Sequence, residues 1–268
     1  MKRNWILILI ILSTGLLTSC FQDSKKNNGS YRKGWTLIWE ENFDESISET
    51  AWTKIPRGTL HSYRYMSDSA ALYNTLNGSL VLSAISNPNE DPKLPFLTGG
   101  INRNAISSGE IRRIEVRARI TPTPGVTPYV SLVPSDGTES IGIDIVEQYG
   151  TDDFIYQSIS SEYTTTHGMA DNPPSTTLIG VNPYDYHTFG VEKYPDSIVF
   201  IVNNLRTKKY PRIPTEIPGQ FPFDDYDLEL LIGLRINKDT DPELLPVNFE
   251  IDWVRYYELD EQVATVNE

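Results

Sequence analysis

Short runs of alternating apolar and polar residues, separated by turn residues, make up most of the chain. In residues 111–120, Ile114, Val116, Ala118 and Ile120 alternate with arginine and glutamate. Residues two apart on a strand share a face, so this run predicts a strand with one buried face. Similar runs predict further strands over residues 35–39, 79–85, 129–133, 141–149, 154–160, 187–193, 197–202, 228–236 and 248–257.

The connections between these runs carry the signals of turns and loops. Eighteen prolines and seventeen glycines punctuate the chain, and no amphipathic helix longer than two turns is evident. The Asn77-Gly78 dipeptide before one strand is typical of a β-hairpin turn. Together these features predict an all-β fold, a two-sheet antiparallel β-sandwich of the jelly-roll type. Residues 87–95 and 164–177 read as irregular loops that would border any cleft.

The N-terminus has the features of a bacterial export signal. Met1-Lys2-Arg3 is basic, and residues 5–17 form an apolar run that is too short to span a bilayer. The following Leu17-Thr18-Ser19-Cys20 resembles a lipobox, which implies cleavage before Cys20 and lipid attachment to its sulfur. We therefore expect a lipoprotein signal peptide over residues 1–19 and an anchor in the bacterial envelope, at the outer membrane or cell surface. An ordinary secretory signal followed by a chance cysteine is the alternative.

Composition divides the rest of the chain into three segments, and the net charge limits the classes of partner that the chain could bind. Residues 20–33 are polar and predict a flexible tether, residues 34–259 one folded domain, and residues 260–268 an acidic tail. The formal net charge is −13, which disfavours nucleic acid and leaves neutral polysaccharide as a fitting partner. The sequence also lacks zinc-ligand spacing, a phosphate loop and a dinucleotide fingerprint.

Residues 139–150 (ESIGIDIVEQYG) form an apolar strand that carries carboxylates. Carboxylates on a half-buried strand are costly unless a partner or a function keeps them there. Gly142 and Asp144 share one face, and Glu147 joins them only if the strand has a one-residue bulge near Ile145-Val146. Such a bulge can place two carboxylates across one sugar bond, and retaining glycosidases need them about 5–5.5 Å apart.

This segment, Gly142-Ile-Asp144-Ile-Val-Glu147, resembles the Glu-x-Asp-x-x-Glu motif of glycoside hydrolase family 16. That family contains laminarinases, lichenases, agarases and related endo-β-glycanases. The resemblance implies a concanavalin A-like jelly roll, a β-linked polysaccharide or glycan as ligand, and no required cofactor. It is closest to lipoprotein members that act on polysaccharides, including host mucin-type glycans. Residues 35–43, 51–55, 97–101, 114–119, 186–192, 195–203 and 249–257 also carry the resemblance.

The motif departs from the family pattern at one position that matters for chemistry. By the resemblance, Glu147 holds the acid/base position and Asp144 the assisting acid, whereas Gly142 holds the position of the nucleophile. Glycine has no side chain and therefore cannot form a glycosyl-enzyme intermediate. Glu139 lies outside the motif's spacing, so we do not expect it to reach the site. The alternative is that Asp144 and Glu147 are simply polar residues that face solvent in a wide groove.

A second departure lies in a neighbouring strand, where Thr127 and Ser131 stand at positions that usually hold tryptophans beside the sugar. The two losses together favour a surface lipoprotein of carbohydrate utilisation that binds a glycan and hydrolyses it poorly. An active endo-β-glycanase that uses another nucleophile or water is the alternative. A structural or adhesion protein without glycan affinity is a third reading.

Tyrosines are candidates for sugar contacts because an aromatic ring can stack on a sugar and its hydroxyl can bond to it. We single out Tyr129, Tyr149, Tyr156 and Tyr163, each of which could equally belong to the core or the rim. His187 resembles a family position near the cleft, and a structural hydrogen bond is the stronger alternative for it.

A structural calcium ion is a further implication of the resemblance. Family members often bind one on the convex side of the sandwich through oxygen ligands, which calcium prefers. The matching positions in this chain are Glu41, Gly78 and Asp252.

Overall fold

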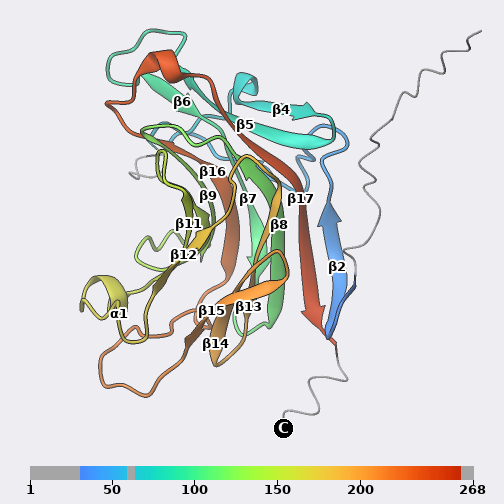
Figure 1. Ribbon diagram of the computed structural model, residues 1–268, viewed down its shortest axis with the longest axis vertical. Helices are drawn as coiled ribbons and strands as arrows, with labels where there is room; N and C mark the ends of the chain where they lie inside the picture. The colour runs from blue at the N-terminus through green and yellow to red at the C-terminus, as the bar shows by residue number, and fades with distance from the viewer. Residues whose placement is uncertain (1–30, 59–63, 261–268) are drawn as a thin grey trace, which may run out of the picture.

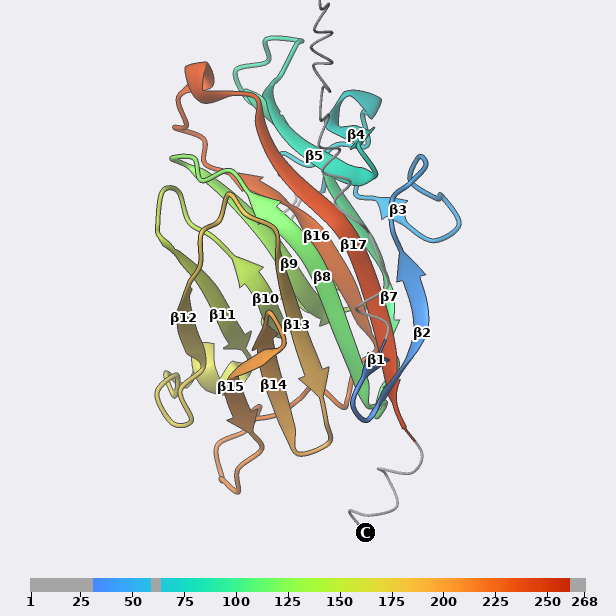
Figure 2. The same cartoon turned by 45° about the vertical axis from the view of Figure 1, so that its right-hand side comes forward.

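A computed structural model describes residues 31–58 and 64–260. These residues form two antiparallel β-sheets packed face to face (Figures 1 and 2). The ten-stranded sheet has the strand order β1-β2-β17-β8-β13-β14-β15, with β5 beside β17 and β4 and β6 beside β5. The seven-stranded sheet has the order β12-β11-β10-β9-β16-β7-β3. The predicted all-β, two-sheet antiparallel sandwich is confirmed.

The ten-stranded sheet contains β1 (Tyr31–Arg32), β2 (Trp35–Glu41), β4 (Tyr73–Leu76), β5 (Ser79–Ser86), β6 (Phe96–Thr98), β8 (Arg112–Ile120), β13 (His187–Lys193), β14 (Ser197–Val202), β15 (Leu205–Pro211) and β17 (Val247–Leu259). The seven-stranded sheet contains β3 (Thr53–Lys54), β7 (Gly100–Ile106), β9 (Val126–Pro134), β10 (Gly142–Glu147), β11 (Phe154–Ser160), β12 (Thr176–Gly180) and β16 (Leu228–Ile236). Short helical turns add α1 (Glu162–Thr165), η2 (Ala70–Leu72) and η3 (Pro242–Leu244).

The core lies between the two sheets and follows the alternation seen in the sequence. On β8, Ile114 and Val116 are fully buried, because they belong to the face that packs on the other sheet. Ile143 on β10 belongs to the same core cluster. The predicted Asn77-Gly78 turn joins β4 to β5, and both of its residues have positive φ. That conformation suits a tight hairpin and favours asparagine and glycine.

A buried lysine at the end of β13 ties a loop to the ten-stranded sheet. Lys193 is fully buried, and its Nζ donates to the Glu110 carbonyl at 3.1 Å and pairs with Asp224. Asp224 also accepts a hydrogen bond from Arg212. An unpaired buried charge is strongly destabilising, so these pairs hold the segment between β15 and β16 against the sheet.

Several elements differ from the sequence-based expectation. The segment 164–177, expected to be irregular, contains the end of α1 and the start of β12. Within the predicted tether 20–33, Tyr31–Arg32 pairs with β2 across a turn in which Gly34 has a φ of 81°. The signal peptide, Cys20 and residues 261–268 lie outside the described residues. Over the residues the structure describes, no helix is long and apolar enough to cross a bilayer.

Candidate functional site

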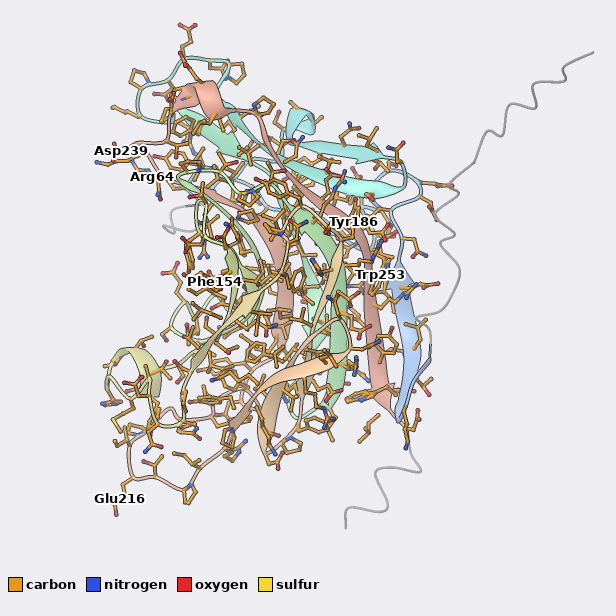
Figure 3. All side chains as sticks on the ribbon, in the orientation of Figure 1. Arg64, Phe154, Tyr186, Glu216, Asp239 and Trp253 are labelled. Atoms are coloured by element: carbon orange, nitrogen blue, oxygen red, sulfur yellow. The ribbon has the colours of Figure 1, made fainter. Side chains whose placement is uncertain are left out.

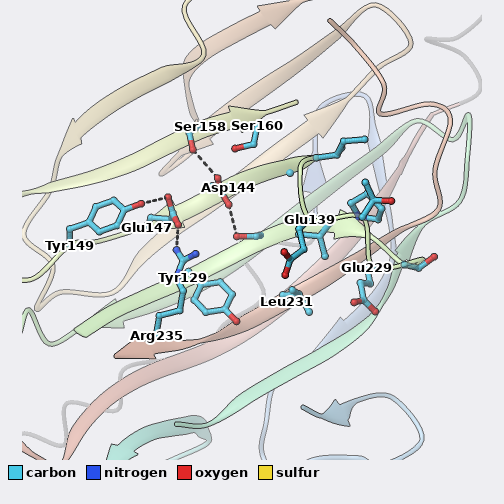
Figure 4. Close-up of a pocket in the computed structure, with 18 residues that line it drawn as sticks. Tyr129, Glu139, Asp144, Glu147, Tyr149, Ser158, Ser160, Glu229, Leu231 and Arg235 are labelled. Carbon is cyan, nitrogen blue, oxygen red and sulfur yellow. Dashed lines mark hydrogen bonds and ion pairs between the residues drawn. The ribbon is translucent and has the colours of Figure 1, made fainter. Parts of the chain in front are cut away.

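A pocket of about 450 Å³ opens on the outer face of the seven-stranded sheet, the face turned away from the ten-stranded sheet. Strands β9, β10, β11 and β16 form its floor, and the turn between β9 and β10 forms part of its wall (Figure 4). The three motif positions Gly142, Asp144 and Glu147 all line this pocket. The sequence motif therefore coincides with a cavity that can hold a small ligand.

A bulge in β10 brings the motif positions together. Asp144 pairs with Ser158 and Glu147 with Tyr156 on β11, and the register shifts between these two pairs. The intervening Ile145 and Val146 are both fully buried, so the extra residue is absorbed on the core side. Strict period-two alternation would place Glu147 on the opposite face from Asp144. The bulge that the motif required is present.

Two serines hold the carboxylate of Asp144. Ser131 Oγ donates to Asp144 Oδ1 at 2.7 Å, and Ser158 Oγ donates to Oδ2 at 2.8 Å. Burial, together with the nearby charge of Glu147, raises the pKa of Asp144 from 3.8 to about 6, although both serine bonds act in the opposite direction. Asp144 can therefore carry a proton under mildly acidic conditions.

Glu147 is fixed by two partners, one of which the sequence did not reveal. Tyr149 donates from its hydroxyl to Glu147 Oε2 at 2.7 Å, and Arg235 on β16 forms an ion pair with Glu147 Oε1. The Arg235 guanidinium also lies 4.7 Å from the centre of the Tyr129 ring. Both oxygens of Glu147 are therefore engaged, and a sugar oxygen would compete with Tyr149 and Arg235 for them.

Gly142, which the motif resemblance assigns to the nucleophile position, has open space around its Cα. A Cβ atom at this position would have the Leu132 carbonyl oxygen as its nearest neighbour, at 3.9 Å, which is an ordinary contact distance. The residue does not have a positive φ, so its backbone does not require glycine. A Cβ atom at position 142 therefore meets no close contact.

Two further carboxylates line the same pocket (Figure 4). Glu139 lies in the turn before β10 and reaches the pocket, although the motif's spacing led us to expect otherwise. Glu229 on β16 accepts a hydrogen bond from Asn102 Nδ2 at 2.9 Å, and burial raises its pKa. Glu139 lies in a turn, and strand periodicity does not predict where the side chain of a turn residue points.

The structure divides the predicted sugar-contact residues into two groups. Tyr129 and Tyr149 line the pocket. Tyr163 on α1 is 1% exposed, and its hydroxyl donates to the Asn172 carbonyl at 2.6 Å. His187 belongs to the ten-stranded sheet, with Nε2 2.9 Å from the Asn182 carbonyl oxygen and Nδ1 2.9 Å from an Asn203 side-chain nitrogen. Tyr163 and His187 are therefore engaged in structural hydrogen bonds away from the pocket.

The two positions that lack tryptophan both border a cavity. Ser131 lines the pocket and bonds Asp144. Thr127 lines an adjoining cavity, and Tyr149 and Arg235 border both cavities. Both positions therefore present a hydroxyl group to a cavity.

The residues assigned to calcium have other partners. Asp252 forms an ion pair with Arg117, and Glu41 accepts a hydrogen bond from the Phe43 backbone at 3.1 Å. Gly78 lies in the β4–β5 turn. Across residues 31–58 and 64–260 there is no group of three or more histidine, cysteine, aspartate or glutamate side chains that could hold a metal ion. Arg117 pairs with Asp252 in this structure, and calcium binding stays a prediction.

Arg235, Ser158 and Glu229 are among the pocket residues that sequence reasoning missed. Arg235 stands near the end of β16, after the mostly apolar stretch Leu228–Leu234. Arginine is rarely found on a buried strand without a partner, so its position could have indicated a site residue. Ser158 carried no signal of its own, because its role follows from the pairing of β10 with β11.

Comparison with known proteins places this geometry among carbohydrate-active folds. No protein-family profile matches the chain. A keratan-sulfate endo-1,4-beta-galactosidase from Sphingobacterium multivorum is 26% identical over 243 residues, which cover 84% of this chain and 56% of that protein. The chain therefore spans little more than half the length of this curated relative.

Solved structures resemble the chain over most of its length. SCLam, a non-specific endo-beta-1,3(4)-glucanase from family 16, superposes with a TM-score of 0.71 at 17% identity, covering 85% of this chain and 93% of SCLam. A structure from work on endo-acting O-glycanases of the human gut microbiota has a TM-score of 0.71 at 20% identity, covering 84% of this chain and all of that one. This chain has the jelly-roll fold of the family 16 glycoside hydrolases.

Proposed function

We propose that this chain binds a β-linked glycan in the pocket on β9, β10, β11 and β16 and hydrolyses it poorly or not at all. The observation that carries the proposal is Gly142, which leaves the nucleophile position empty in a pocket that keeps Asp144 and Glu147. Removing a catalytic nucleophile costs about 10^6-fold in rate in a well-studied hydrolase. The remaining carboxylates cannot offset a loss of that size.

The chemistry of the pocket suits the hydroxyl groups of a neutral sugar. The charge of Glu147 is balanced by Arg235, and hydroxyls from Tyr149, Ser158 and Ser160 line the walls. Buried polar groups bind a ligand selectively when each finds a hydrogen-bond partner on it. Such a set recognises hydroxyl positions without performing bond cleavage.

The names of similar proteins indicate which classes of glycan should be tested first. One acts on keratan sulfate, another on β-1,3(4)-glucan, and a third belongs to work on mucin O-glycans. We propose a ligand built of uncharged β-linked sugars of the kinds found in these classes. The shared fold supports this choice of ligand class.

Binding and hydrolysis can be measured separately on the same protein. We expect saturable binding of the full chain to one of these glycans on an array or by calorimetry, with no release of reducing ends above a heat-denatured control. Sustained turnover would contradict the proposal. Flat binding curves for every glycan would favour a structural or adhesion role instead.

An active endo-β-glycanase with a different nucleophile is the second candidate. The position of Glu139 at the pocket favours it, because this carboxylate could attack directly or activate a water molecule. If the wild type does hydrolyse a glycan, Glu139→Gln distinguishes the two routes. Loss of turnover in that variant would assign the role to Glu139, and the anomeric form of the product by NMR would separate direct attack from water.

We further propose that the chain is a lipoprotein anchored through Cys20 in the bacterial envelope. The motivation is the lipobox-like Leu17-Thr18-Ser19-Cys20 after an apolar run. Several buried acyl carbons at about 0.8 kcal/mol each give stable membrane binding. Metabolic labelling with an alkyne-tagged palmitate should mark the wild type and leave Cys20→Ser unlabelled, and equal labelling of both would exclude this anchor.

A further inference from the structure

Beside the pocket, four side chains form a partly exposed apolar surface on the same sheet. We call Tyr149, Phe154, Tyr156 and Leu178 the aromatic platform. Tyr149 is 43% exposed, Phe154 45% and Leu178 51%. Phe154 lies on the side of the seven-stranded sheet that faces away from the ten-stranded sheet (Figure 3). Large apolar side chains exposed side by side mark sites of interaction more often than isolated ones do.

Strand pairing places the platform in a row with the pocket. Glu147 on β10 pairs with Tyr156 on β11, and Tyr156 pairs with Leu178 on β12. Ser158 bonds Asp144 from the same face of β11, and residues two apart on a strand share a face. Phe154 and Tyr156 therefore face the ligand side, and the row runs across the strands from the pocket to β12.

Nothing on β12 covers Phe154 from the side. Gly180 is the residue paired with Phe154, and among the described residues no heavy atom lies within 4 Å of where its Cβ would be. Strand β12 is also the edge of the sheet (Figure 2). The ring of Phe154 is thus open toward the end of the row.

The tyrosines of the platform are held in place before any ligand arrives. The rings of Tyr149 and Tyr156 lie 5.1 Å apart at 78°, an edge-to-face contact. The Tyr149 hydroxyl donates to Glu147, and the Tyr156 hydroxyl donates to Asp152 Oδ2 at 2.7 Å. Fixing side chains in advance lowers the entropic cost of binding.

We propose that the aromatic platform binds additional sugar rings of a neutral β-linked glycan whose one end occupies the pocket. The inference rests on the proposed function and adds the direction in which the chain lies. Tyr149 lines the pocket and belongs to the platform, so the two surfaces are continuous. The apolar faces of pyranose rings match exposed aromatic rings, and neighbouring Asp152 and Asp153 disfavour an anionic partner.

The length of the ligand provides the test. Oligosaccharides of the glycan that binds best, from disaccharide to hexasaccharide, are titrated into the full chain and into the double variant Phe154→Ser, Leu178→Ser. We expect the hexasaccharide to bind the double variant about tenfold more weakly, a loss of about 1.4 kcal/mol, because the variant lacks one aromatic and one leucine contact. The disaccharide should bind both proteins equally, because the pocket is unchanged.

Two further variants guard against indirect effects. Leu205→Ser removes an exposed leucine of 71% exposure from β15, in the other sheet, and should leave every affinity unchanged. Phe154→Trp keeps an aromatic ring and should retain hexasaccharide binding even if the double variant folds poorly.

Three outcomes would overturn the inference. Equal hexasaccharide affinity in the wild type and the double variant leaves the pocket proposal standing and rejects the platform. Concentration-dependent self-association that disappears in the double variant would assign the platform to a second copy of this chain. An absence of binding to any glycan by the wild type would reject the proposed function together with the platform.

Discussion

Replacing Gly142 by glutamate is expected to give the chain endo-β-glycanase activity with retention of the anomeric configuration. The new carboxylate would stand on the same face as Asp144 and Glu147, in a position where the nearest neighbour of the Cβ is 3.9 Å away. It would also lie two residues from Asp144, the assisting acid. The variant would then hold the two carboxylates that a retaining mechanism needs.

The size of the gain depends on Glu147. A nucleophile contributes about 10^6-fold, and general acid catalysis contributes about 10^2- to 10^4-fold. Because Arg235 and Tyr149 engage both oxygens of Glu147, we expect most of the acid contribution to be missing. The variant should then exceed the wild type by about 10^2- to 10^4-fold.

The matched control is Gly142→Gln, which has nearly the same shape and cannot attack the anomeric carbon. Reducing-end release and NMR of the first product should show activity in the glutamate variant alone. Equal activity in both variants would mean that the nucleophile comes from elsewhere, with Glu139 the first candidate. Inactivity of both, with glycan binding retained, would place the deficit at Glu147 or Ser131.

Asp144→Asn is expected to stabilise the protein at neutral pH and to have little effect in acid. The pKa of Asp144 is raised from 3.8 to about 6, chiefly by burial and then by Glu147. Below the unfolded pKa the group is protonated in both states and contributes nothing to pH dependence. As pH rises from about 4 to about 6, the unfolded state ionises first, so the ionisable carboxyl reduces stability.

The size of the pKa shift of Asp144 sets the size of its effect on the free energy of unfolding. At about 1.4 kcal/mol for each pKa unit, ionisation of Asp144 lowers the free energy of unfolding by up to about 3 kcal/mol above pH 6. Urea unfolding of the wild type and the variant at several pH values would measure it. We expect the stability difference to grow between pH 4 and pH 7 and then level off.

Asp239→Asn is a suitable control, because Asp239 is exposed and its ion pair with Lys238 is long, at 4.0 Å. An exposed pair of this kind contributes at most about 1 kcal/mol. A difference for Asp144→Asn that stays constant with pH would show that the carboxyl is not perturbed. A destabilised variant at every pH would mean that the bonds from Ser131 and Ser158 outweigh the burial of charge.

The strands could be predicted because their side chains obey the sheet period. The predicted ranges 154–160, 187–193, 197–202 and 228–236 match β11, β13, β14 and β16. Strand β15 was missed because its sequence, LRTKKYP, is mostly polar and has only one buried residue. Its identity as a strand follows from pairing with β14, which no local pattern records.

The candidate site could be predicted only where its residues lie on one strand. Gly142, Asp144 and Glu147 lie on one strand, so strand parity together with the expected bulge was enough to bring them together. Arg235 is distant in sequence and reaches Glu147 through the order β10-β9-β16. Tyr163 is a tyrosine like Tyr149, and only the packing of α1 directs it inward.

The bulge in β10 has an evolutionary consequence. Its geometry is set by backbone pairing with β9 and β11, so it does not depend on which residue stands at position 142. A glycine codon can become a glutamate codon through a change of a single base. A lineage built on this scaffold could therefore pass between receptor and enzyme without rebuilding its architecture.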